Sequence, residues 1–167
     1  MLHKQNISNI EVVKSKNVLL FFSGLHIADE NISNLKSIHE EISKNDQYKI
    51  VWIPIVEQWT NEMQNNLEKL GSNMPWYTVY NFSSVSGIKY VKEEWQFKSR
   101  PIIVVLNPQG IVKHQNALHM IKVWGINAFP FTIEKEQEVS TGKDWFRPFI
   151  FDINPDVSTW VKLFSQI

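Results

Sequence analysis

The chain has no cysteine among its 167 residues. Thiol–disulfide exchange needs a thiolate, so this chain cannot carry out that chemistry. An excess of either charge is also missing, because 17 lysines and arginines balance 17 aspartates and glutamates. Zero net charge argues against electrostatic capture of nucleic acid or of an acidic membrane surface. It also leaves a protein poorly protected against self-association.

Long apolar runs and targeting signals are lacking as well. No stretch of about 18 apolar residues occurs, so we expect no membrane span. Residues 1–6 have no apolar centre of the signal-peptide kind. Together with the lack of cysteine, this pattern favours a cytoplasmic protein. The sequence also contains no Gly-rich phosphate loop, so no nucleotide cofactor is predicted.

Aromatic residues are plentiful, at 13% of the chain with seven tryptophans. Tryptophan buries a large apolar area and keeps one polar group, which suits both interfaces and packed cores. The sequence alone leaves both interpretations open, and for any single tryptophan the core is the better expectation.

Apolar periodicity predicts alternating strands and helices. Residues 18–23 and 102–106 are continuous apolar runs typical of strands buried on both faces, and Asn107 to Gly110 has the pattern of a turn that returns the second run as a hairpin. Asp29 or a near neighbour is expected to cap the first helix. The predicted order is strand 18–23, helix 28–44, strand 48–53, helix 60–70 stopped by Gly71, extended piece 74–79, helix 84–95, hairpin 102–113 and helix 116–124.

The same pattern divides the chain into three parts. Residues 1–16 are a lead-in, residues 17–132 form the α/β core, and residues 133–167 form a C-terminal extension packed on that core. Within the extension, Glu134 to Glu138 is expected to be a solvated charged stretch, and residues 155–164 a last short helix.

The predicted order of elements resembles that of thioredoxin: a three-layer sandwich with a central mixed β-sheet and helices on both faces. Six strings in fixed order carry a more specific resemblance. They are Val51–Ile55, Met74–Tyr77, Trp95–Phe97, Arg100–Leu106 with Pro108–Gly110, Asn116–Met120 and Trp124–Thr132. Together these strings resemble the sieve element occlusion proteins of plant phloem, the P-protein family that includes the forisome subunits. The same strings are similar, more distantly, to nucleoredoxin and tryparedoxin.

The resemblance implies a function without catalysis. It implies that the chain is the central thioredoxin-like domain of a longer structural protein, located in the cytoplasm of sieve elements. Subunits of the family assemble into filaments or bodies that plug sieve tubes after wounding, and forisomes swell on calcium. The implied partners are further copies of the chain, as a dimer or filament, and other sieve element occlusion subunits, with calcium acting on the whole protein. The alternative is a redox-inactive module that binds a protein or peptide.

The resemblance also marks a vacant site. The segment that would carry thiols contains Ile27, Ala28, Asp29 and Glu30, and Pro101 stands where thioredoxin-like folds place a cis-proline. We therefore predict a degenerate active-site segment, a cis-proline at Pro101, and no catalytic residue. His26 lies beside this segment but has no nucleophile as a partner, so it too is not expected to be catalytic.

No metal site or cofactor is predicted. His114 and His119 are five residues apart, whereas zinc sites on one helix use spacings of three or four. Asp152 to Asp156 begins like a calcium loop, but Val157 and Leu163 replace the glycine and glutamate that the loop requires. Asp29 with Glu30, and the run of residues 134–138, could bind calcium weakly if several chains shared the ion. Solvated charge is the simpler interpretation of both groups.

Overall fold

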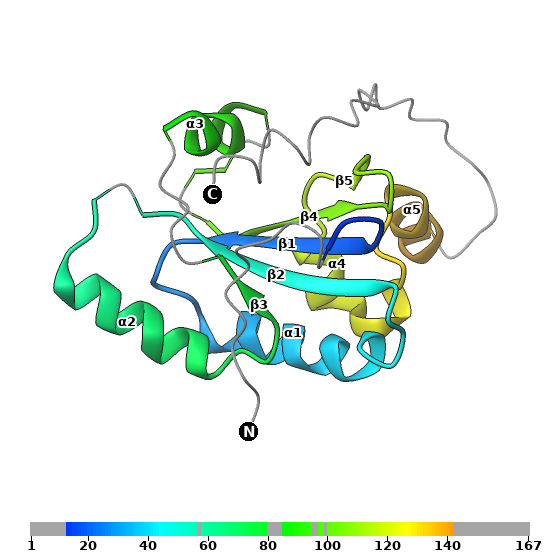
Figure 1. The fold of residues 1–167 in the computed structure, drawn as a ribbon. Helices are drawn as coiled ribbons and strands as arrows, with labels where there is room; N and C mark the ends of the chain where they lie inside the picture. The colour runs from blue at the N-terminus through cyan, green and yellow to red at the C-terminus, as the bar shows by residue number, and fades with distance from the viewer. Residues whose placement is uncertain (1–12, 57, 80–84, 95–96, 99, 142–167) are drawn as a thin grey trace.

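One sheet of five strands forms the centre of the molecule (Figure 1). The computed structural model of the chain describes residues 13–56, 58–79, 85–94, 97–98 and 100–141. The strand order is β3-β2-β1-β4-β5. The strands are β1 (Asn17–Ser23), β2 (Tyr48–Pro54), β3 (Tyr77–Thr78), β4 (Ile102–Leu106) and β5 (Val112–His114).

Strand β1 lies between a parallel and an antiparallel neighbour. It pairs with β2 in parallel register, with Phe21 opposite Trp52, and with β4 in antiparallel register, with Phe21 opposite Ile103. Such a position buries both faces of the strand, which explains why β1 is apolar at nearly every residue. The mixed sheet predicted from the sequence is therefore confirmed.

Helices cover both faces of this sheet, as Figure 1 shows. One layer holds α1 (Asp29–Ile42), α2 (Asn61–Ser72) and α4 (Leu118–Trp124), and the other face carries α3 (Val85–Glu94). A 3-10 turn, η2 (Gly125–Ala128), and α5 (Ile133–Thr141) follow α4. None of the helices in the described part of the chain has the length and apolar character needed to cross a membrane.

The side chains of each strand divide between two cores because successive residues point to opposite faces. Leu19 and Phe21 of β1 join Trp52 in the core beneath α1, α2 and α4. Leu20 and Phe22 join the opposite core, to which Val91 of α3 contributes. The three layers predicted from the sequence are present.

Several elements differ from the predictions, most by one or two residues at their ends. Gly71 lies inside α2, which continues to Ser72, and α4 begins at Leu118 rather than Asn116. The larger difference is α5, a helix over residues for which a solvated charged stretch was predicted. Thr132 explains its start, because the Thr132 hydroxyl accepts a hydrogen bond from the Lys135 amide at 3.1 Å. The predicted helix 155–164 lies outside the described residues.

Two lysines clamp the turn between α1 and β2. Lys16 Nζ lies 2.8 Å from Asp46 Oδ2, and Lys49 Nζ lies 3.0 Å from Asp46 Oδ1. The hydrogen bond from Lys16 and then that from Lys49 lower the pKa of Asp46 from 3.8 to about 2. The lead-in to β1 is thereby tied to the start of β2.

Asp46 should make the fold sensitive to strong acid. A carboxyl whose pKa is lower in the folded state contributes stability above its unfolded value of 3.8, and that stability is lost as the pH falls toward about 2. We expect Asp46→Asn to flatten the pH dependence of the free energy of unfolding between these two values. Urea titrations at several pH values test this, and an equal slope for both proteins would contradict it.

Candidate functional site

The segment predicted to be a degenerate active site lies where β1 meets α1. Leu25 and Ile27 are half-buried and pack against the core beneath α1. His26, Ala28 and Asp29 are exposed. The apolar side chains of Leu25 and Ile27 therefore face the core. The exposed side chains of the loop, His26, Ala28 and Asp29, offer neither a thiol nor a hydroxyl nucleophile.

The first helical turn after this loop has no side-chain cap. The N-cap position predicted at Asp29 or a near neighbour is occupied by the neighbour, Ala28, which makes no side-chain hydrogen bond to the helix. An alanine methyl group cannot accept a hydrogen bond from the first amides of the helix. Asp29 and Glu30 in the first turn offset this in part, because carboxylates favour the positive end of the helix dipole.

Ala28→Ser should stabilise the protein by about 1 kcal/mol, because a serine hydroxyl at the N-cap accepts from an amide of the first turn. Urea denaturation followed by circular dichroism measures the change. The matched variant is Thr60→Ala on α2, where the Thr60 hydroxyl accepts from the Met63 amide at 3.2 Å. That variant should lose about 1 kcal/mol. Equal stability of Ala28→Ser and the unaltered chain would contradict the prediction.

A buried hydrogen bond fixes the start of the loop. Trp52 Nε1 donates to Ser23 Oγ at 2.8 Å, and Ser23 Oγ donates to the carbonyl of Gly24 at 2.8 Å. Both Trp52 and Ser23 are fully buried. The end of β1 is thus held against β2 by side chains, in addition to the strand ladder.

Pro101 does not have the predicted geometry. Among the peptide bonds of the described residues, the one recorded as cis joins Phe129 to Pro130, so the prediction of a cis-proline at Pro101 is corrected. That prediction carried over a geometry from thiol enzymes. An X–Pro bond by itself prefers trans by about 0.5–1 kcal/mol.

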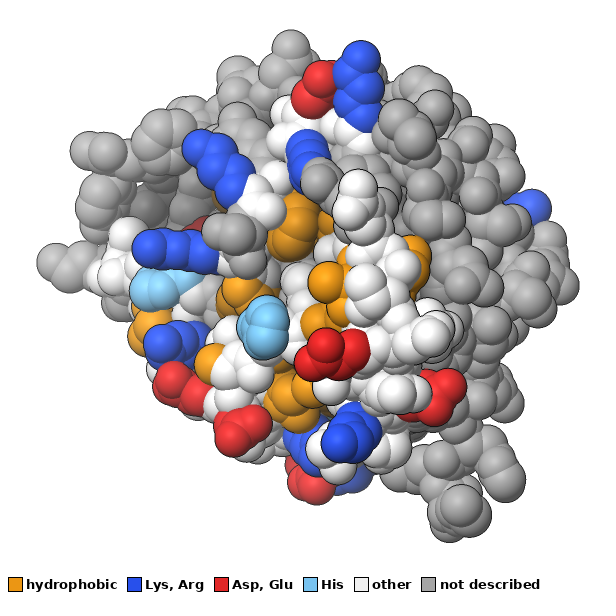
Figure 2. Space-filling view, turned by 90° about the vertical axis from the view of Figure 1, so that its left-hand side faces the viewer, with side chains coloured by type: hydrophobic (Ala, Val, Ile, Leu, Met, Phe, Trp, Pro, Cys, Tyr) orange, Lys and Arg blue, Asp and Glu red, His pale blue; other side chains and the backbone are white. Residues whose placement is uncertain are grey.

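A groove of about 610 Å³ runs beside Pro101, between the start of β4 and the start of α4. The charged residues that line it within the described ranges are basic: Lys98, Arg100 and Lys122. Figure 2 views the end of the molecule at which β1 and β2 terminate, and Lys and Arg side chains gather with a histidine on the left part of this face. Hydrophobic side chains lie between them. The remaining lining residues are Asn31, Pro101, Ile102, Asn116, Leu118 and His119.

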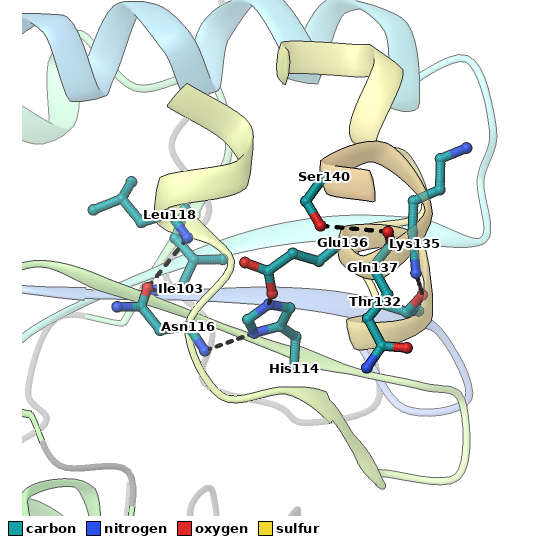
Figure 3. Close-up of polar contacts among 9 residues, drawn as sticks. All are labelled: Ile103, His114, Asn116, Leu118, Thr132, Lys135, Glu136, Gln137 and Ser140. Atoms are coloured by element: carbon teal, nitrogen blue, oxygen red, sulfur yellow. Dashed lines mark hydrogen bonds and ion pairs between the residues drawn. The ribbon is translucent and has the colours of Figure 1, made fainter. Parts of the chain in front are cut away.

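Asn116 shapes one wall of this groove (Figure 3). Its Oδ1 accepts from the amide of Ile103 at 3.2 Å and from the amide of Leu118 at 3.1 Å. One side chain thereby joins β4 to the first turn of α4. The Asn116 carboxamide oxygen is committed to these bonds, and its NH₂ group is a donor.

His114 links β5 to α5, a contact that the sequence did not reveal (Figure 3). The side chain is buried, with Nε2 2.7 Å from Glu136 Oε2. The Asn116 amide donates to His114 Nδ1 at 3.0 Å, so the proton of the neutral imidazole lies on Nε2 and is donated to Glu136. The pair ties α5 to β5, although none of the α5 residues is buried.

Two of the carboxylates considered as calcium ligands form ion pairs with lysines. Glu30 Oε2 lies 3.6 Å from Lys122 Nζ, and Glu138 Oε1 lies 3.2 Å from Lys135 Nζ. His119 is exposed, and its ring meets Trp124 edge-on at 6.3 Å. Within the described ranges, no three histidine, aspartate or glutamate side chains are grouped so that they could hold a metal ion. The predicted calcium-like loop at Asp152 to Asp156 lies outside the described residues.

Comparison with curated proteins bears out the family resemblance. The chain is 32% identical to protein SIEVE ELEMENT OCCLUSION B of Arabidopsis thaliana, over 92% of this chain and 23% of that protein. It is 33% identical to SIEVE ELEMENT OCCLUSION A of the same plant, over 86% of this chain and 18% of that protein. This chain is a relative of the sieve element occlusion proteins. It spans less than a quarter of the length of either one.

More distant matches agree with the fold of this sieve element occlusion relative. Probable nucleoredoxin 1 of Arabidopsis thaliana is 26% identical over 78% of this chain and 22% of that protein. The solved structure of tryparedoxin II from C. fasciculata superimposes with a TM-score of 0.63 at 14% identity, covering 81% of this chain and 92% of that one. These matches establish the thioredoxin-like fold. No protein-family model matches the chain.

Proposed function

We propose that the chain is a non-enzymatic structural module of a phloem occlusion protein. In this proposal it associates with further copies, and with related subunits, into filaments or bodies that plug sieve tubes after wounding. The observation that carries the proposal is the similarity, over 92% of the chain, to a protein named for sieve element occlusion. The lack of cysteine supports the non-enzymatic part, since thiol chemistry is closed to this chain.

The proposal places the protein in the cytoplasm of sieve elements and includes a forisome-like response to calcium. We assign that response to the whole protein. Glu30, Glu136 and Glu138 each contact a basic side chain, so calcium would have to displace an existing partner at each of them.

Two exposed apolar side chains mark a surface for association. Val123 on α4 is 53% exposed, and Ile126 on η2, three residues later, is 40% exposed. Exposed large hydrophobic side chains lower their free energy when a second molecule covers them. We propose that a second copy of the chain covers these two.

Sedimentation velocity of the 167-residue chain over a concentration series tests the proposal. We expect concentration-dependent dimers or larger species, weakened by the double variant Val123→Ser with Ile126→Ser. Met63→Ser on α2 is the matched control, because Met63 is also exposed, at 37%, but lies away from α4. A chain that remains monomeric at every concentration would contradict assembly through this domain.

The same series with calcium and with a chelator tests the finer part of the proposal. A calcium-dependent shift of the association equilibrium would place part of the response within this domain. An unchanged equilibrium would contradict that placement, without affecting assembly itself.

The second candidate function is a redox-inactive module that binds a peptide. The groove beside Pro101 favours it, because the groove lies next to the vacant segment and combines apolar walls with hydrogen-bond donors. Binding there would need no thiol. This function would be supported by a peptide that binds the unaltered chain and no longer binds a variant substituted at Pro101.

A further inference from the structure

The groove beside Pro101 has the charge pattern of an anion site. Lys98, Arg100 and Lys122 line it, and the NH₂ group of Asn116 adds a neutral donor. Among the lining residues in the described part of the chain there is no aspartate or glutamate. Because the whole chain carries no net charge, this local excess of positive charge decides which ligands are attracted.

The groove also has an apolar side. Pro101, Ile102 and Leu118 line it together with the cations. A small inorganic anion would leave these apolar groups uncovered, whereas a peptide can place a carboxylate and an apolar side chain side by side. The combination therefore selects a ligand that is acidic and partly apolar.

We infer that this groove binds an extended acidic peptide segment of another protein, whose carboxylates contact Arg100, Lys98 and Lys122 and whose apolar side chain covers Pro101. This inference rests on the second function proposed above, the peptide-binding module. Arginine suits the role because its guanidinium group holds a carboxylate through two parallel hydrogen bonds.

An internal carboxylate competes for one of these cations. Glu30, in the segment that replaces the thiols, lies 3.6 Å from Lys122 Nζ. Both side chains are more than half exposed, at 63% and 52%, so the pair is weak and a ligand can displace it. The degenerate segment thus modulates the groove: in the free chain Glu30 occupies Lys122, and a bound peptide takes its place.

Fluorescence anisotropy with a short labelled peptide of alternating glutamate and leucine tests the inference on the 167-residue chain. We expect this peptide to bind about fivefold more tightly than the analogue with glutamine for glutamate, and salt to weaken binding. Lys98→Gln with Arg100→Gln should weaken binding about three- to tenfold. Glu30→Gln should strengthen it about twofold, because Lys122 is released. Lys69→Gln, an exposed cation on α2, is the control and should have no effect.

Three results would overturn the inference. They are equal affinity for the glutamate and glutamine peptides, unchanged affinity in the Lys98→Gln, Arg100→Gln variant, and tighter binding of oligo(dT) than of the acidic peptide. Circular dichroism is used to check that each variant is folded. We expect this because Lys98 and Arg100 are exposed.

Sedimentation velocity on the same variants separates this inference from the assembly function. A monomeric chain that prefers the glutamate peptide contradicts assembly and supports the groove. If the unaltered chain associates but shows no preference for the glutamate peptide, the inference fails and assembly stands. If the Lys98→Gln, Arg100→Gln variant loses both self-association and peptide binding, a second copy of the chain supplies the acidic segment, which overturns the assignment of that segment to another protein.

Discussion

Replacing Trp52 with alanine is expected to lower the free energy of unfolding by about 3–5 kcal/mol. Trp52 is fully buried beneath α1, in register with Phe21 on the central strand. The change removes the largest fully buried side chain of that core and leaves a cavity that the neighbouring strands cannot close. It also removes the donor that holds Ser23 at the end of β1. Urea denaturation followed by far-ultraviolet circular dichroism measures the loss.

Because a domain of this size is stable by only about 5–15 kcal/mol, the alanine variant can fail to fold. Ser23→Ala keeps the prediction testable, since it retains the indole ring and removes only its acceptor. A buried N–H without an acceptor should cost about 1–3 kcal/mol. Ser43→Ala, at the exposed end of α1, is the control and should change stability by less than about 0.5 kcal/mol. Equal effects of the two serine variants would contradict the role assigned to Ser23.

Replacing Gly125 with alanine is expected to destabilise the protein by about 1–3 kcal/mol. Gly125 ends α4 with φ 56° and ψ −136°, a backbone conformation that residues with a Cβ atom rarely adopt. A Cβ atom placed there would meet no other atom within 4 Å, so the cost comes from the backbone alone. Thermal and urea unfolding of Gly125→Ala measure this cost.

Gly24→Ala is a matched control for Gly125→Ala. A Cβ atom on Gly24 would also meet nothing within 4 Å, but Gly24 lacks the positive φ of Gly125. Alanine there restricts the unfolded chain and should be neutral or stabilising by up to about 1 kcal/mol. If the two variants lose equal stability, the difference in backbone conformation does not explain the role of Gly125.

The loop between β1 and α1, predicted from the sequence to be a degenerate active-site segment, connects the fold to the proposed functions. Leu25 and Ile27 anchor this loop on the core. Glu30 then projects to the rim of the groove, where it meets Lys122. A segment that cannot perform thiol chemistry is thereby positioned to influence ligand binding.

The sequence by itself determined the sheet, the main helices and the absence of thiol chemistry. Continuous apolar runs such as residues 18–23 have no other stable place than the middle of a sheet, and helix α1 follows from the spacing of Ile32, Leu35, Ile38 and Ile42. The strings resembling sieve element occlusion proteins were also readable from the sequence, and the curated relatives confirm them.

Only the tertiary structure decided three features: the helix α5, the geometry of the peptide bond before Pro101, and the position of the basic groove. Residues 133–141 have weak apolar periodicity, and their helix depends on the Thr132 cap and on the contact between Glu136 and His114, 22 residues away. The groove unites Lys98 and residues 100–102 with residues 116–122 because β4 and β5 pair antiparallel and Asn116 ties β4 to α4. Such contacts depend on pairings between distant segments, which the local sequence pattern does not encode.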